Sequence, residues 1–192
     1  MPSQSAAWYV LVYAVLPLWM IAGFADYLCH RAAHSTQANG AKEAILHWLM
    51  LGEVGLPLLA AVFLKINALL FGLMILCWIA HEITTHIDLQ LAIRTRTVTA
   101  FEQQVHSFLE VLPVAALILL AVSHWDQALA LFGAGTQRAD LSLALKPLAP
   151  PMQLIALFGG LLIFGVIPYC DELWRGLRAA RAGKDDEAWE SL

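Results

Sequence analysis

HEITTHIDLQLAIRTRTVTAFEQQVHSFLE, residues 81–110, is the most informative stretch of this sequence. It is rich in histidine and carboxylate side chains, yet strongly apolar segments lie on both sides of it. Ionisable side chains in membrane helices are costly, so they are usually paired, bound to a metal or directed toward water. We therefore expect a metal site at one membrane face, with the rest of the chain as its scaffold.

The composition indicates a membrane protein. The 192 residues are 60% hydrophobic and 14% charged, whereas soluble domains are nearer half apolar and a quarter charged. We predict one all-α integral membrane domain with about five transmembrane helices, four of which form a metal-binding bundle near the cytoplasmic face. The predicted spans are residues 6–28, 44–64, 68–91, 102–122 and 152–170, followed by a polar tail at 171–192.

Other features of the composition argue against several classes of protein. The N-terminus lacks the basic residues of a cleaved signal peptide, so we expect the first apolar run to be a retained helix. The three cysteines are scattered and form neither a disulfide framework nor a CxxC motif. A net charge of −4 without a long basic patch does not favour nucleic-acid binding.

Basic residues are distributed unevenly between the two predicted membrane faces. One face carries Arg31, Lys42, Arg94, Arg96, Arg175, Arg178, Arg181 and Lys184, and the other carries only Lys65, Arg138 and Lys146. The richer face should be cytoplasmic, which places the N-terminus outside and the C-terminus inside, in what we expect to be a bacterial inner membrane. The loops after the first and third helices share this face, so the polar residues beside them should lie at one depth.

An acid precedes a histidine by four residues at four places: Asp26/His30, Glu43/His47, Glu82/His86 and Glu102/His106. Random placement would produce about half of one such pair, so we interpret the spacing as a signal. Four residues turn a helix by only ~40°, so each pair shares a face. The first four predicted helices thus each present an acid and at least one histidine.

Carboxylate oxygen and imidazole nitrogen suit iron, manganese or zinc, and soluble di-iron bundles collect similar ligands from four helices. We predict two iron ions, with zinc or manganese as alternatives. The predicted ligands are His30, His34, Glu43, His47, His81, Glu82, His86, Asp88, Glu102 and His106. An acid one turn from a histidine can instead orient the ring, and Asp26, Glu110 and Glu53 are the candidates for such supporting roles.

Two details qualify this ligand set. Thr99 and Glu102 fit a capping box, so Glu102 has a purely structural alternative. On the third helix, His81 and Asp88 share one face while Glu82 and His86 form a second polar stripe. Two stripes predict a helix in the middle of the bundle that touches two metals.

Residues 26–34, DYLCHRAAH, followed by LHW at 46–48, resemble the first histidine box of the membrane fatty acid hydroxylase and sterol desaturase superfamily. That family has an acid, then HRxxH, and further histidine boxes that hold two irons at the cytosolic membrane face. The resemblance implies ligand roles for His30 and His34, with His47 as a weaker match. The HxxHH boxes of the family are absent, and Glu-x-x-x-His pairs stand in their place.

The function that these observations favour is a membrane di-iron oxidoreductase of the hydroxylase, desaturase or oxygenase type. It would use O₂ and an external electron donor on a lipophilic substrate. A chain of this length has no room for a flavin or iron–sulfur domain, so we expect a separate electron-transfer protein. Its other expected partners are membrane lipids.

Two alternatives remain open. Three histidines with a carboxylate could form a zinc-dependent membrane lipid hydrolase, and intramembrane acids and histidines could form a proton or ion carrier. Haem is less favoured because it needs only one or two axial ligands. HEITTH resembles the zinc-protease HExxH, but its extra residue places the two histidines ~140° apart on a helix.

Overall fold

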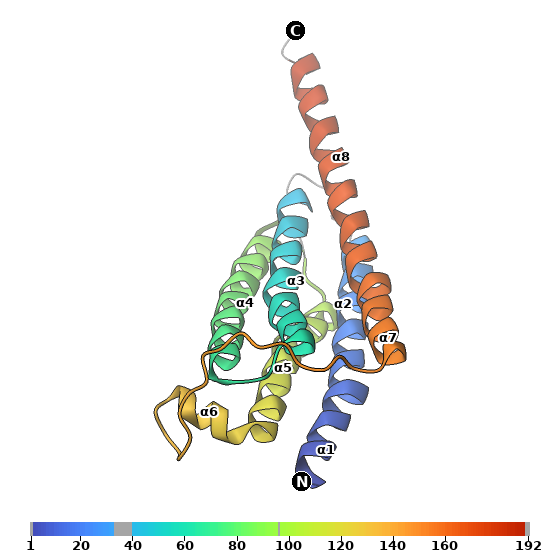
Figure 1. Ribbon diagram of the computed structural model, residues 1–192. Coiled ribbons are helices and arrows are strands. Elements are labelled where there is room, and N and C mark those ends of the chain that lie inside the picture. Colours follow the sequence, from blue (N-terminus) through green and yellow to red (C-terminus); the bar gives the residue numbers. More distant parts are fainter. Residues whose placement is uncertain (1, 33–39, 96, 191–192) are drawn as a thin grey trace.

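The computed structural model describes residues 2–32, 40–95 and 97–190, with side chains described for 6–32, 40–94 and 97–182. Within this part of the chain every regular element is a helix (Figure 1). Five helices are long and apolar enough to cross a membrane: Ala6–Ala32, Gly40–Phe63, Ala68–Arg94, Ala100–Ser123 and Pro151–Ala182. The predicted all-α fold with five membrane-spanning helices is confirmed.

The first and fifth spans are each interrupted by a π-helical turn. The first consists of α1 (Pro2–Val10), η1 (Leu11–Val15) and α2 (Leu16–Ala32), and the fifth of α7 (Pro151–Leu161), η2 (Leu162–Val166) and α8 (Ile167–Glu190). Each π turn ends two residues before a proline, Pro17 or Pro168. Proline lacks the N–H and crowds the preceding turn, and a wider turn accommodates both effects without ending the helix.

The middle helices form the centre of the bundle. They are α3 (Gly40–Phe63), α4 (Ala68–Thr95), α5 (Ala100–Ser123) and the short α6 (Trp125–Leu131). The helix α3 packs against α4 and α8, and α2 packs against α5 (Figure 1). The predicted capping box at the start of α5 is present, since Thr99 and Glu102 each accept a hydrogen bond from the other's backbone N–H.

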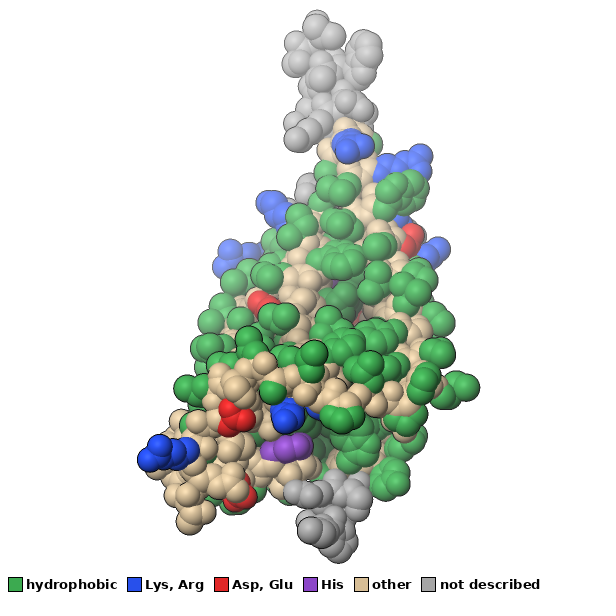
Figure 2. Space-filling view, viewed as in Figure 1, with side chains coloured by type: hydrophobic (Ala, Val, Ile, Leu, Met, Phe, Trp, Pro, Cys, Tyr) green, Lys and Arg blue, Asp and Glu red, His purple; other side chains and the backbone are tan. Residues whose placement is uncertain are grey.

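The bundle has an apolar half and a polar half. The apolar core lies toward the N-terminal end and consists of Leu11, Val15, Leu70, Phe71, Met74, Leu112 and Leu120. Lys and Arg side chains gather instead toward the end from which α8 projects, above a broad apolar band (Figure 2). The polar interior of the bundle lies toward this same basic end.

An extended segment joins α6 to α7 and crosses the lower ends of α4 and α3 (Figure 1). It is held to the turn between these two helices. Lys65 N–H donates to the Ala144 carbonyl at 2.8 Å, and Lys146 N–H donates to the Phe63 carbonyl at 3.0 Å. The region that we expected to be an interfacial excursion is thus pinned to the bundle by backbone hydrogen bonds.

The fifth span continues beyond its predicted end. We placed the boundary at Cys170, with a polar tail after it, whereas α8 runs without a break to Glu190. The beginning of this continuation packs closely against α3, since a Cβ on Gly176 would lie 2.8 Å from the backbone nitrogen of Ala41. Glycine allows the two backbones to approach, and so the polar first turns of α8 lie inside the bundle.

We predict that Gly176→Ala lowers the stability of the protein by about 1–3 kcal/mol, because the added methyl group must separate α8 from α3. Thermal unfolding of the detergent-purified protein, followed by circular dichroism, measures the change. The matched control is Gly52→Ala on α3, where a Cβ meets no atom within 4 Å. Equal melting temperatures for both variants would contradict the inferred close approach.

Candidate metal centre

Five carboxylates and three imidazoles meet at the basic end of the bundle, and all of them are buried. They come from α2, α3, α4, α5 and α8, so all five long helices contribute. The cluster consists of Asp26, His30, Glu43, His47, Asp88, Glu102, His106 and Glu172. We refer to these side chains as the polar cluster.

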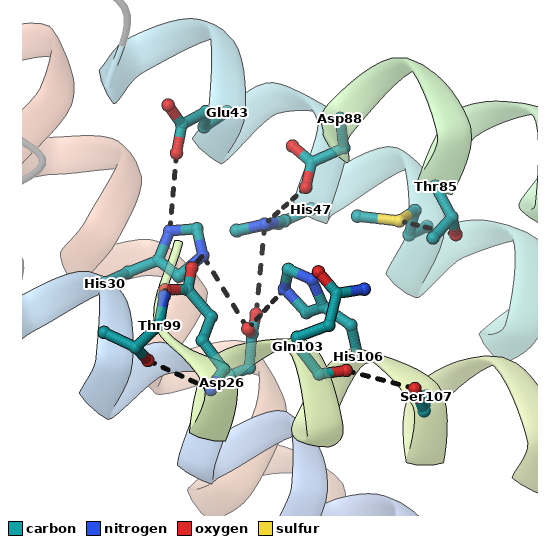
Figure 3. Close-up of polar contacts among 12 residues, drawn as sticks. Asp26, His30, Glu43, His47, Thr85, Asp88, Thr99, Gln103, His106 and Ser107 are labelled. Carbon is teal, nitrogen blue, oxygen red and sulfur yellow. Dashed lines mark hydrogen bonds and ion pairs between the residues drawn. The ribbon is translucent and has the colours of Figure 1, made fainter. Parts of the chain in front are cut away.

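Asp26 lies at the centre of the polar cluster, between the three imidazole rings (Figure 3). Its Oδ1 is 2.8 Å from His106 Nε2 and 3.7 Å from His30 Nε2. Its Oδ2 is 3.9 Å from His47 Nε2. We expected Asp26 only in a supporting role, but its carboxylate faces all three histidines of the cluster.

His30 presents its two ring nitrogens to different sides. Its Nδ1 is 2.9 Å from Glu172 Oε1 and 3.7 Å from Glu43 Oε2. Its Nε2 is 3.5 Å from Glu102 Oε1 and also faces Asp26. The ring is fully buried, so its orientation is set by these carboxylates and not by water.

Two overlapping groups within the polar cluster have ligand atoms that all lie within 4.8 Å of one another. They are Asp26, His30, Glu102 and His106 in the first group, and His30, His47 and Glu172 in the second. Because His30 belongs to both, the two groups are adjacent. Neither contains all three histidines, which disfavours a single zinc ion held by a three-histidine site.

Several distances in the cluster are too long for hydrogen bonds but suit atoms that share an ion. His47 Nε2 lies 3.6 Å from Asp88 Oδ2, and both His47 Nε2 and Asp88 Oδ1 are buried without a hydrogen bond. Ligand atoms at ~2.1 Å from one ion are about 3–3.5 Å apart in tetrahedral or octahedral geometry. The 3.5 Å between His30 Nε2 and Glu102 Oε1 lies within this range, and the 3.6 Å between His47 Nε2 and Asp88 Oδ2 lies just beyond it.

The charges of the cluster lead to the same conclusion. If all five carboxylates are ionised, even three protonated imidazoles leave two negative charges uncompensated. The nearby arginines do not supply them, since Arg31 and Arg175 contact Asp171 at 3.4 and 2.9 Å. Uncompensated buried charges cost several kcal/mol each, and two divalent cations would compensate four of five carboxylate charges while the histidines stay neutral.

Glu172 is the ligand candidate that sequence reasoning missed. Its two carboxylate oxygens are each 2.9 Å from a histidine Nδ1, on His30 and on His47. No histidine follows it by four residues, so it lacks the spacing that identified the other acids. The available signal was topological: an acid at the end of a fifth span reaches the same face as the end of the first. Asp171 is also an acid at the end of the fifth span, but its side chain does not point into the polar cluster.

Glu102 forms the predicted capping box and also faces a histidine of the polar cluster. Its Oε2 accepts the hydrogen bond from Thr99 N–H at 3.5 Å, and its Oε1 faces His30. The capping box thereby fixes the direction of the carboxylate. A structural role for Glu102 is therefore compatible with a role as ligand.

His81 and Glu53 form a separate site deeper in the bundle. His81 Nδ1 is 3.7 Å from Glu53 Oε2, and Thr84 Oγ1 donates to Glu53 Oε1 at 2.8 Å. His81 does share the inward face of α4 with Asp88, as expected. Seven residues of helix separate them by ~10 Å, however, so the same face does not mean the same depth.

The remaining candidates lie outside the polar cluster. His86 is exposed, because it is two residues from Asp88 and thus ~200° around the helix from the inward face. Glu82 accepts a hydrogen bond from Trp78 Nε1 at 3.0 Å, and Glu110 is only partly buried. The second stripe of α4 therefore does not contribute to the polar cluster. His34 lies outside the described residues.

No protein-family model, curated protein or solved structure matched this chain. The chemistry of the site is therefore inferred from its own geometry. Ligand roles for His30 and His47 agree with their positions in the polar cluster, while membership of the hydroxylase and desaturase superfamily stays a prediction.

We predict that Glu172→Gln lowers metal affinity about 10–100-fold, the usual cost of losing a partner of a metal-binding histidine. Metal content after dialysis against a graded series of chelator concentrations measures this. Asp171→Asn is the matched control, since it removes the same charge from the adjacent residue without touching the polar cluster. Equal metal retention in both variants would contradict the placement of Glu172.

A second comparison concerns the histidines of α4 and α5. We expect His106→Ala to lose bound metal, because His106 is in the first ligand group, while His86→Ala keeps it because that ring faces outward. Elemental analysis of the two purified proteins gives the answer. Loss of metal in His86→Ala with retention in His106→Ala would reverse the assignment.

Proposed function

We propose that this chain is a membrane oxidoreductase of the hydroxylase, desaturase or oxygenase type that holds two metal ions, preferentially iron. The observation that best supports this is the pair of adjacent ligand groups that share His30. Imidazole with carboxylate is a donor set that non-haem iron uses. Di-iron carboxylate proteins gather such side chains inside helical bundles.

The polar cluster divides naturally between two ions. Asp26, Glu102 and His106 would hold one, His47 and Glu172 would hold the other, and His30 lies between them. When bound, a pair of iron ions supplies the activation of O₂ that oxidation of an apolar C–H bond requires. The carboxylates supply the negative charge that stabilises such ions in an apolar bundle.

Residues of the chain itself orient the ligands and exclude water. Glu172 Oε2 lies 2.9 Å from His47 Nδ1, which fixes the direction of that ring. Tyr169 is buried beside it, with ring centroids 5.6 Å apart, and covers the cluster on the side of α8. A dry site protects reactive species from unproductive reaction with water.

The surroundings of the site favour a lipophilic substrate. The polar cluster lies within helices that are long and apolar enough to cross a membrane, and an apolar cavity extends through the deeper half of the bundle. We further propose that electrons come from a separate protein on the cytoplasmic side of a bacterial inner membrane, the side that the distribution of Lys and Arg predicts.

Elemental analysis and Mössbauer spectroscopy of detergent-purified protein test this proposal. We expect about two irons per chain with a coupled di-ferric signal, and O₂ consumption that requires a chemical reductant. The His106→Ala protein is the control and should show neither signal nor consumption. One zinc per chain without O₂ consumption would favour a hydrolase, and no metal after attempted reconstitution would favour a proton or ion carrier.

A further inference from the structure

The apolar half of the bundle contains a cavity of about 570 Å³. Its walls come from the first span, α3, α4, α5 and the start of the fifth span, and they are almost entirely apolar. Charged side chains line it at two places, Glu53 toward the polar cluster and Lys146 toward the opposite face. This volume is within the range of small-molecule binding sites.

Lys146 is placed at the cavity by the extended segment between α6 and α7. Its backbone N–H is bonded to the Phe63 carbonyl, and its ammonium group donates to the Ala61 carbonyl. An ammonium group has three donors, so two remain for a ligand. Lys146 is half-buried, and this partial burial lowers the pKa of its ammonium group.

The charge of Lys146 has no counter-charge in the part of the chain that the structure describes. None of the described ion pairs includes it. Lys65 on the same face differs, since it is exposed and lies near Asp140. A half-buried cation at the end of an apolar cavity is complementary to an anion that carries a hydrocarbon chain.

We propose that this cavity binds one long-chain carboxylate, with its head group at Lys146 and its chain directed toward Glu53. A single cation matches the single charge of a carboxylate, and the Gln153 amide in the cavity wall can donate to its second oxygen. Phosphate groups are bound preferentially by arginine and by several donors together. The described wall of the cavity contains no arginine.

The length of the cavity sets where the chain ends. Ala61 and Glu53 are eight residues apart on α3, or ~12 Å, and His47 lies ~9 Å further along the helix. An extended chain advances ~1.2 Å per bond, as in a fully extended polypeptide. A chain of about ten bonds therefore reaches Glu53, and one of about seventeen reaches the depth of the polar cluster.

Glu53, Thr84 and His81 form the boundary between the cavity and the polar cluster. A bound chain would thus approach the metal centre with its methyl end, while its head group stays at the opposite membrane face. The binding itself does not depend on the metal chemistry. Oxidation of the chain near its methyl end rests on the proposed function.

Photo-cross-linking of the full-length purified protein tests the orientation. The probe is palmitate with a diazirine about ten bonds from its carboxylate, the distance that reaches Glu53, and mass spectrometry locates the label. We expect label near Glu53 and Trp78, competed by unlabelled palmitate but not by phosphatidylglycerol. Label on outward-facing side chains such as Leu76 and Ile83, or competition by phosphatidylglycerol alone, would overturn the proposal.

Matched variants test the head-group contact. Lys146→Gln should weaken palmitate binding about tenfold or more, the effect of losing a hydrogen bond to a charged group, while hexadecanol binding is unchanged. Lys65→Gln is the control and should bind palmitate like the wild type. Unchanged palmitate affinity in Lys146→Gln would overturn the assignment of the anchor.

A second pair tests the cavity. Ala116→Trp fills it and should abolish binding of both palmitate and hexadecanol, whereas Ile118→Trp on the outward face of α5 should not. Thermal unfolding followed by circular dichroism should give the wild-type melting temperature for both tryptophan variants, which shows that they are folded. Equal binding by both tryptophan variants would place the chain elsewhere, independently of whether iron or O₂ consumption is found.

Discussion

Five carboxylates and three imidazoles buried inside an apolar helical bundle form the constraint on which the rest of this structure depends. Each uncompensated charge in such surroundings costs several kcal/mol, and every long helix contributes at least one of the side chains. Positive charge among the carboxylates would remove this cost and let the helices pack closely at this end. We therefore expect metal binding to stabilise the packing of the polar half, as it does in small metal-stabilised domains.

Specific local features of the helices position the residues of the polar cluster. The capping box at Thr99 directs Glu102 inward at the first turn of α5. Gly176 lets α8 approach the start of α3, which carries Glu172 to His47. The π turns before Pro17 and Pro168 keep the outer spans continuous, so that residues at their far ends reach the same depth. Each of these features is local, but each helps to determine where a residue of the polar cluster lies.

The two halves of the bundle have complementary chemistry. The polar cluster is suited to hold ions, while the apolar half combines a hydrophobic core with a cavity of about 570 Å³. Glu53, Thr84 and His81 separate the two halves with a small hydrogen-bonded site. This arrangement suits chemistry on an apolar chain, because the chain and the charged ligands need different surroundings but must meet at one boundary.

Much of the architecture follows from the sequence alone. The apolar runs determined five spans, and the acid–histidine spacing determined which pairs share a helix face. The alternation of spans placed these pairs at one membrane face. The helical period also placed His81 and Asp88 on one side of α4.

Only the tertiary structure decided which faces point inward. A helical repeat relates the residues of one helix to each other, but the rotation of that helix about its axis is set by its neighbours. Packing thus turned Asp88 into the cluster and His86 away from it, and placed Asp26 at the centre. Packing also placed Glu172 in the polar cluster. Its partners are 125 or more residues away in the sequence and come close only when α8 packs against α2 and α3.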